Sequence, residues 1–192
     1  MSTETNPRGR PRAFDTDEIL QQSVEVFWRH GFSGTTTRTL EQELGISQSS
    51  LYNAFGSKEK LFEQTVSRYE EQLEAEVMSH LAGDDPDRDS LLAFVDAVTI
   101  WIRNDDHRGC LVLNLGLDTE DGGRRVTAYR AKLRELLSKA IGSFTYAEAD
   151  IEARTELIVA AILGLNISAS SGASKAELLR LRDGIKHQIR AW

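Results

Sequence analysis

Apolar residues recur every three or four positions along most of the chain, which is the spacing of one face of an α-helix. Leu20, Val24 and Phe27 follow this spacing near the N-terminus, and the segments Leu61–Val77 and Val126–Phe144 repeat it over longer stretches. The three prolines, at positions 7, 11 and 86, leave two long stretches without a residue that interrupts a helix. No stretch of the sequence shows the period-two alternation of a half-buried strand. We therefore expect an all-α protein of about nine helices.

Capping and helix-breaking residues divide this pattern into separate helices. Asp15 or Thr16 is expected to begin the first helix and Gly31 to end it. Pro86 is expected to stand in the first turn of the fifth helix, where its missing N–H costs nothing. The other predicted helices cover residues 38–44, 48–55, 57–77, 108–119, 148–168 and 175–190, and a seventh runs from Val126 after a turn at 121–123.

Two of the predicted helices form a recognisable supersecondary motif. The helices at 38–44 and 48–55 are short and are separated by a three-residue turn that opens on Gly45. This is the helix-turn-helix pattern, in which glycine supplies the positive φ that a tight turn requires. We therefore divide the chain into a flexible basic arm (1–13), a three-helix helix-turn-helix DNA-binding domain (14–60), and an effector-binding and dimerisation domain (61–192).

The same region carries a specific composite of glycine, threonine, aromatic and basic residues. It reads Gly-Phe-Ser-Gly-Thr-Thr at 31–36, Leu-Tyr-Asn-Ala-Phe-Gly at 51–56 and Ser-Lys-Glu-Lys at 57–60. Residues 14–62 resemble, without a gap, the DNA-binding domain of TetR-family transcriptional regulators. The remaining two-thirds of the chain is similar to that family in helix count and lengths, and the resemblance implies a helical C-terminal domain that binds an effector. The sequence departs from the family pattern at Leu40–Glu41, where an apolar-Ala pair is frequent, and at Asn53.

In a helix-turn-helix motif the second helix enters the major groove of DNA. Gln48, Ser49 and Asn53 would then face base edges, and a glutamine can pair with adenine through two hydrogen bonds. The resemblance implies that Thr37, Tyr52 and Lys58 contact phosphates. The remaining predicted contacts are Thr36, Arg38, Ser47 and Ser50, together with Arg10 and Arg12 of the arm, which either enter a minor groove or belong to a solvated tail.

A second distinctive segment reads His-Arg-Gly-Cys-Leu-Val-Leu-Asn at 107–114. It resembles a Gly-Cys-Leu-x-x-Asn segment at the sixth helix in one branch of the TetR family, where some members sense electrophiles or oxidants through the cysteine. A thiol near a helix N-terminus, with His107 and Arg108 upstream, would have a depressed pKa. The alternative is that Cys110 is a small apolar residue of the core.

The family resemblance also implies an effector pocket between the fourth and eighth helices. An apolar cavity with a few polar groups is typical of small-molecule sites. The residues expected to line it or to take part in sensing are Val98, Trp101, Ile102, Cys110, Leu113, Asn114, Leu117, Tyr129, Ile162 and Asn166. The sequence predicts no cofactor and no metal site, because the acidic segment 85–96 lacks the glycine and glutamate of a calcium loop.

The last two predicted helices carry apolar residues that would form a four-helix interface with the same helices of a second chain. The predicted interface residues are Leu157, Ile158, Ala161, Leu165, Leu178, Leu181, Ile185 and Ile189. A two-fold homodimer would bind a pseudo-palindromic double-stranded operator, and an effector that shifts the fourth helix would release the protein from this operator. The alternatives are a regulator without an effector and an enzyme that uses Cys110 with His107 as base.

Charge changes this picture less than its total suggests. The 192 residues carry a net charge of −7, which by itself argues against a polyanionic partner. Residues 1–60 hold seven Lys/Arg and eight Asp/Glu, so most of the acidity belongs to the C-terminal domain, where Glu70, Glu71, Glu74 and Glu76 are expected to form a solvated face. A single cysteine and the lack of a long apolar run favour a cytoplasmic protein with no membrane partner.

Overall fold

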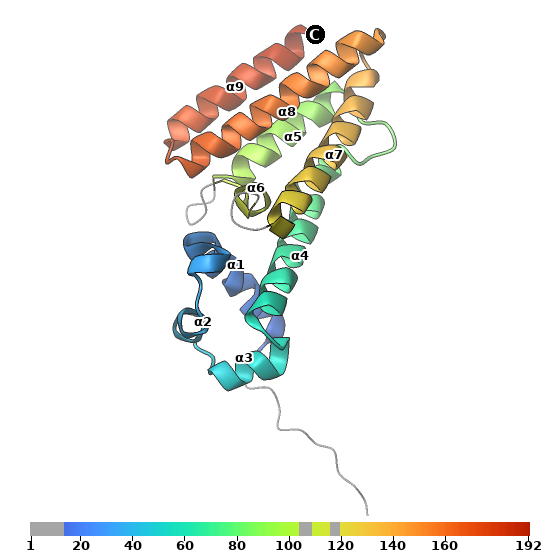
Figure 1. Ribbon diagram of the computed structural model, residues 1–192. Coiled ribbons are helices and arrows are strands. Elements are labelled where there is room, and N and C mark those ends of the chain that lie inside the picture. The colour runs from blue at the N-terminus through green and yellow to red at the C-terminus, as the bar shows by residue number, and fades with distance from the viewer. Residues whose placement is uncertain (1–13, 104–108, 116–119) are drawn as a thin grey trace, which may run out of the picture.

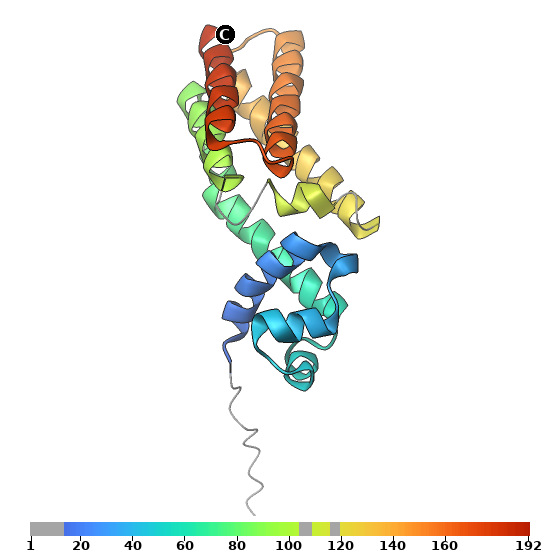
Figure 2. The same ribbon diagram turned by 90° about the vertical axis from the view of Figure 1, so that its left-hand side faces the viewer.

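The computed structural model describes residues 14–103, 109–115 and 120–192. Over these residues the backbone is helical and contains no strand. The elements are α1 (Thr16–Gly34), α2 (Thr37–Leu44), α3 (Gln48–Phe55), α4 (Lys58–Glu76), the 3₁₀ turn η1 (Met78–His80), α5 (Arg88–Trp101), α6 (Leu111–Leu115), α7 (Glu120–Gly142), α8 (Glu148–Ser170) and α9 (Lys175–Ala191). Figures 1 and 2 show α1–α3 at one end of an elongated molecule and α5–α9 at the other, joined by α4.

The three N-terminal helices begin where the sequence predicts. The Asp15 carboxylate caps α1 by accepting from the Asp17 amide at 2.8 Å, and Thr36 and Ser47 cap α2 and α3. Gly45 follows α2 with a φ of 65°, which confirms the tight turn. Gly31 is also in the left-handed region, but it kinks α1 instead of ending it, because helical turns continue to Gly34.

Aromatic and aliphatic side chains hold these helices against the first half of α4. Phe27 and Phe62 pack edge to face with ring centroids 4.9 Å apart, and Leu40, Leu51 and Phe55 are almost fully buried. The prediction that Phe55 belongs to the core is therefore confirmed. The burial of five large apolar side chains is enough to stabilise a small three-helix domain on α4.

Helix α4 belongs to both ends of the molecule (Figure 1). In its C-terminal half the Glu70 carboxylate accepts from Arg125 of α7 at 2.6 Å, and Glu74 pairs with Lys132 of α7. The prediction that this glutamate-rich stretch is a solvated face is therefore wrong for Glu70, whose side chain is half-buried, whereas Glu74 stays exposed beside its partner. Helical spacing identifies a polar face, but only the packing of α7 alongside α4 supplies the cations.

Two predicted boundaries are wrong for local reasons. Pro86 lies before α5, because the Asp87 carboxylate accepts from both the amide and the hydroxyl of Ser90 and so makes Asp87 the cap. The predicted turn at 121–123 lies within α7, which begins at Glu120. Gly122 is buried there, and tertiary packing offsets the cost of about 1 kcal/mol that glycine carries in a helix.

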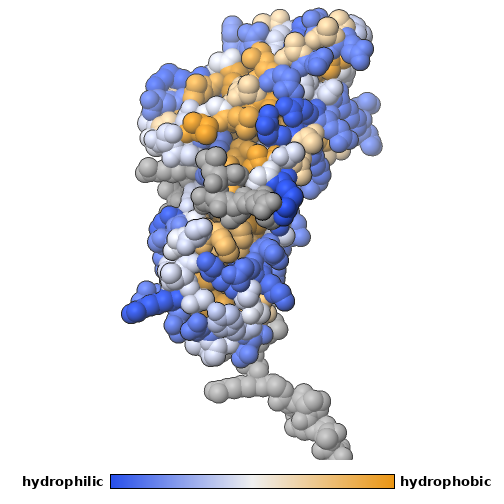
Figure 3. All heavy atoms as spheres, in the orientation of Figure 1, coloured by the Kyte–Doolittle hydropathy of each residue, from blue (hydrophilic) through white to orange (hydrophobic). Residues whose placement is uncertain are grey.

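The C-terminal domain packs α8 between its neighbours, with α7 on one side and α9 on the other. Asp96 of α5 forms ion pairs with Lys186 and Arg182 of α9, which fixes α9 against α5. Among the described residues no helix is long and apolar enough to cross a membrane. Figure 3 shows apolar residues gathered on the visible face of this domain, and three side chains of α8 and α9 contribute exposed apolar surface: Leu157, Ile167 and Leu181.

Candidate DNA-binding surface and effector pocket

The predicted DNA-contacting residues lie together on α2, on α3 and at the start of α4. Gln48, Ser49 and Asn53 are exposed on α3, and the Tyr52 side chain is 41% exposed. Thr36 and Arg38 are exposed on the adjacent end of α2, while Thr37 and Ser50 are half-buried. This end of the molecule therefore presents one polar surface around α3. Arg10 and Arg12 lie outside the described residues.

Internal hydrogen bonds already engage part of this surface. The Gln48 side-chain amide donates to the Thr37 hydroxyl at 3.3 Å, which holds the glutamine against α2. The Gln48 backbone amide donates to the Glu41 carboxylate at 3.3 Å. An amide at the α3 N-terminus, the kind of group that can bind a phosphate, thus faces an intramolecular anion at the positive end of the α3 dipole.

The Lys58 ammonium is bonded within the domain, although the family resemblance implies that it contacts a phosphate. Its ammonium donates to the carbonyls of Phe32 at 3.0 Å and Thr35 at 2.9 Å, and it lies 4.1 Å from the centroid of the Phe32 ring. The carbonyls at the end of α1 lack helical partners, so the lysine caps them. Two of its three donors are occupied within the domain, and a phosphate contact would use the third.

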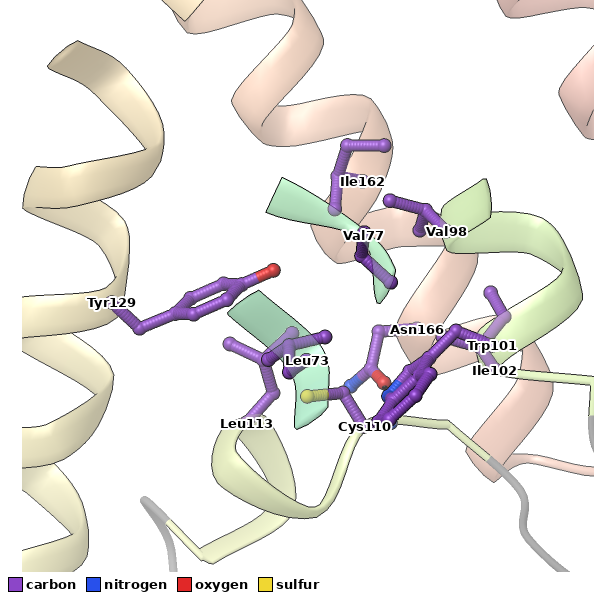
Figure 4. Close-up of a pocket in the computed structure, with 10 residues that line it drawn as sticks. All are labelled: Leu73, Val77, Val98, Trp101, Ile102, Cys110, Leu113, Tyr129, Ile162 and Asn166. Atoms are coloured by element: carbon purple, nitrogen blue, oxygen red, sulfur yellow. Dashed lines mark hydrogen bonds between the residues drawn. The ribbon is translucent and has the colours of Figure 1, made fainter. Parts of the chain in front are cut away.

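A small cavity lies between α4, α5, α6, α7 and α8 (Figure 4). Its free volume is about 10 Å³, which is room for about one water molecule. The structure brings six predicted residues together around it: Trp101, Ile102, Cys110, Leu113, Ile162 and Asn166. Val98 and Tyr129 also line it, whereas Asn114 does not but bonds to Asn166, and Leu117 lies outside the described residues.

The start of α6 is held in place by polar groups from α4 and α8. The Cys110 amide donates to the Asn166 side-chain oxygen, and the Leu111 amide donates to the Tyr69 hydroxyl at 3.2 Å. Gly109 makes this approach possible, since a Cβ there would lie 2.3 Å from the Ser170 hydroxyl oxygen, and its φ of 95° disfavours other residues.

Cys110 is 3% exposed, and burial raises the pKa of its thiol. Hydrogen bonds from the Leu113 amide and the Tyr69 hydroxyl act in the opposite direction but do not outweigh desolvation. The prediction of a depressed thiol pKa is therefore wrong for this conformation, and His107 and Arg108, on which it relied, lie outside the described residues. The interpretation of Cys110 as a buried core residue fits these observations.

Three residues that complete this site were not assigned to it from the sequence, two in α4 and one at its C-cap. Leu73 and Val77 line the cavity, and the Tyr69 hydroxyl accepts from the Trp101 indole at 2.6 Å. Tyr69 also stacks near Trp28 of α1, with centroids 6.2 Å apart. Helical spacing predicted all three as core residues, and nothing in the pattern separates a residue that lines a cavity from one that fills a core.

The predicted interface residues fall into two groups. Ile158, Leu165, Leu178 and Ile189 are at most 3% exposed in the single chain, so they are core residues and their assignment to an interface is wrong. Helix α8 packs against neighbours on more than one side, and periodicity along an almost uniformly apolar helix does not show which side remains open. Leu157, Ala161, Leu181 and Ile185 keep exposed or half-buried side chains.

Comparisons with known proteins agree with this arrangement. Residues 19–65, which span most of α1 to the start of α4, match the family model for bacterial regulatory proteins of the TetR family. These residues of the chain carry the DNA-binding region of the TetR family. The helix-turn-helix end and the helical C-terminal domain of the chain have the TetR fold, and the chain is a DNA-binding transcriptional regulator.

Individual relatives and solved structures match most of the chain. The HTH-type transcriptional repressor ComR of Escherichia coli strain K12 is 28% identical over 186 residues, which cover 91% of this chain and 88% of ComR. A cysteine mutant of the TetR-family regulator CifR, solved with 26-bp double-strand operator DNA, is 29% identical with a TM-score of 0.79 and covers 95% of this chain and 100% of its own. SCO4454 of Streptomyces coelicolor shares the fold at 18% identity, with a TM-score of 0.74 and coverage of 90% and 94%.

Proposed function

We propose that this TetR-family protein is a cytoplasmic homodimeric repressor that binds a pseudo-palindromic operator and leaves it when an effector enters the cavity described above. One observation carries the proposal: α4 packs on α1 with its first half and lines the cavity with Leu73 and Val77 in its second half. The repressor ComR and the operator complex of CifR support the DNA-binding part.

On the DNA side, we assign base contacts to Gln48, Ser49 and Asn53, which are exposed on α3. Tyr52 and Arg38, exposed at the edges of the same surface, would contact phosphates. In a dimer the two copies of α3 would lie about one turn of DNA apart, so the operator would contain two half-sites with that spacing.

On the effector side, the small free volume makes binding and movement inseparable. A ligand larger than water must displace lining side chains, among them those of α4. Because α4 also carries part of the N-terminal domain, its displacement would alter the separation of the two copies of α3. A loss of operator affinity of about 10³-fold requires about 4 kcal/mol of difference in ligand binding between the two conformations.

The coupling can be tested without knowing the effector. Val98 lines the cavity and is 4% exposed, whereas Val159 is 2% exposed and does not line it. Overpacking lowers the stability of both Val98→Phe and Val159→Phe. At a temperature where both are folded, only Val98→Phe should bind an operator selected from random DNA at least ~10-fold more weakly than the wild type. Equal affinity for both variants would reject coupling through the cavity.

A regulator without an effector remains a second candidate, because the cavity has room for only about one water molecule. In that case operator occupancy would depend on protein concentration alone. A screen of small molecules by melting temperature separates the two, since a ligand that binds the folded state must raise it.

A further inference from the structure

One polar group in the cavity has no partner. Tyr129 projects from α7 toward α4 and α8, with its hydroxyl pointing into the cavity (Figure 4). Among the described residues no group forms a hydrogen bond with this hydroxyl. The other polar side chains of the lining are engaged. The Asn166 oxygen accepts from the Cys110 amide and its nitrogen donates to Asn114, while the Trp101 indole and the Cys110 thiol both bond to the Tyr69 hydroxyl. Tyr129 is half-buried, and its free O–H donor can bond to an acceptor that enters the cavity.

The lining also carries no charge. All ten side chains that the structure places around the cavity are uncharged types at neutral pH. Burial raises the pKa of the Tyr129 hydroxyl and of the Cys110 thiol, so both keep their protons. A charged ligand would lose its hydration without gaining a counter-ion in such a site.

We propose that the cavity takes a small, uncharged and mostly apolar ligand that carries one hydrogen-bond-accepting oxygen, and that Tyr129 donates to this oxygen. The ligand class includes ketones, esters and ethers. The inference rests on the proposed function, because it specifies the effector of the same cavity. Its apolar part would pack on Leu73, Val98 and Ile162, and its oxygen would end at the unpaired hydroxyl.

The position of Tyr129 on α7 also explains how such a ligand acts on α4. Arg125 precedes it by one helical turn and pairs with Glu70 of α4, and Lys132 follows it and pairs with Glu74. Residues three and four apart lie on the same helix face. A ligand held by Tyr129 therefore occupies the contact surface between α7 and α4, between the two ion pairs that join these helices.

The test uses three probes of similar size: acetophenone, which carries an acceptor oxygen; ethylbenzene, which lacks it; and benzoate, which carries a charge. Binding to the full-length protein is measured by isothermal titration calorimetry, and operator release is measured separately by fluorescence anisotropy. Tyr129→Phe removes only the hydroxyl. Tyr146→Phe is the matched control, because Tyr146 is 97% exposed and lies away from the cavity.

Acetophenone is expected to bind the wild type and the Tyr146→Phe variant about tenfold more tightly than ethylbenzene does. In Tyr129→Phe this preference should disappear, while ethylbenzene binding stays unchanged. Benzoate should bind at least ~100-fold more weakly than acetophenone.

Each of four results would overturn the inference. The wild type could bind acetophenone and ethylbenzene equally, or Tyr129→Phe could keep the preference for acetophenone. Benzoate could bind more tightly than acetophenone, or acetophenone could fail to bind. A different result would contradict the proposed function alone. If acetophenone binds through Tyr129 but does not release the operator, the ligand class is supported and effector release is contradicted. If ethylbenzene releases the operator and acetophenone binds no more tightly than ethylbenzene, effector release is supported and the ligand class is contradicted.

Discussion

Single side chains at the junctions between helices have roles that their residue types do not reveal. Lys58 is a basic residue beside a DNA-binding helix, but its ammonium is bonded to two carbonyls at the end of α1. Cys110 carries the only thiol of the chain, but burial keeps that thiol protonated. In both cases the surroundings of the side chain, which are set by helices distant in sequence, decide its chemistry.

Lys58→Met should lower the free energy of unfolding by about 1–3 kcal/mol, because two buried carbonyls lose a charged donor and the contact with the Phe32 ring is lost. Urea denaturation followed by circular dichroism measures this effect. Lys60→Met is the matched control, since Lys60 is exposed two residues further along α4. If the two variants were equally stable, the capping role of Lys58 would be wrong.

Cys110 should react with iodoacetamide at least ~100-fold more slowly in the folded protein than in guanidinium chloride, because the thiol is buried and its pKa is raised. The raised pKa also sets a direction with pH. The stability that the protonated thiol contributes is complete below the unfolded-state value of about 8.5 and is lost as pH rises toward the folded-state pKa.

The pH effect is measured by comparing the wild type with Cys110→Ser, whose hydroxyl does not titrate in this range. Between about pH 8.5 and pH 10 the stability of the wild type should fall more steeply. Parallel curves, or equal alkylation rates in the folded and unfolded chains, would show that the thiol is open to solvent.

At the scale of elements, close approaches between helices depend on a few glycines and on carboxylates at helix starts. Gly109 lets the start of α6 dock on α8, and Glu41 of α2 lies at the N-terminus of α3. Both interactions connect elements across a turn or a long loop, so the local sequence pattern predicts the helices but not their contacts.

Gly109→Ala should destabilise the protein by about 2 kcal/mol or more, because its Cβ would lie 2.3 Å from the Ser170 oxygen in a backbone conformation that alanine disfavours. Gly123→Ala is the opposite case, with no atom within 4 Å of the new Cβ and a helical position in α7. It should gain about 0.5–1 kcal/mol. Melting curves of the two variants test both signs.

Glu41→Gln should increase affinity for DNA of any sequence by about two- to fivefold, because a negative charge beside α3 is removed while a hydrogen-bond acceptor remains. The control is Glu25→Gln, at an exposed position on α1. Fluorescence anisotropy with operator and non-operator DNA at two salt concentrations measures the effect. An unchanged or lower affinity for non-operator DNA would contradict it.

The whole molecule is an elongated protomer in which α4 connects the helix-turn-helix end to the helical C-terminal end (Figure 1). The open apolar side chains of the C-terminal end lie mainly on α8 and α9, with Leu157 50%, Ile167 62% and Leu181 44% exposed. Exposed apolar surface of this kind is typical of association between subunits. Ile167 was not among the predicted interface residues, because the sequence pattern assigned neighbouring positions that are buried in the single chain.

Ile167→Glu should convert the proposed dimer to monomers and reduce operator affinity by at least ~100-fold, because two charges would face each other across a two-fold interface and each half-site would be bound alone. Sedimentation equilibrium measures the mass, and fluorescence anisotropy measures the affinity. Ile100→Glu is the control, since Ile100 is 66% exposed on α5. Dimers that persist in the Ile167 variant would place the interface elsewhere.

The sequence by itself determined the local features of this protein. Helical periodicity, the caps Asp15, Thr36 and Ser47, and Gly45 in its turn all depend on residues within a few positions of one another, so the all-α fold and the helix-turn-helix motif could be predicted. Tertiary structure decided which apolar face of α8 is buried and that Glu70 is paired. Tertiary structure also placed the hydroxyl of Tyr129 at the cavity. All three properties depend on helices that meet only after folding.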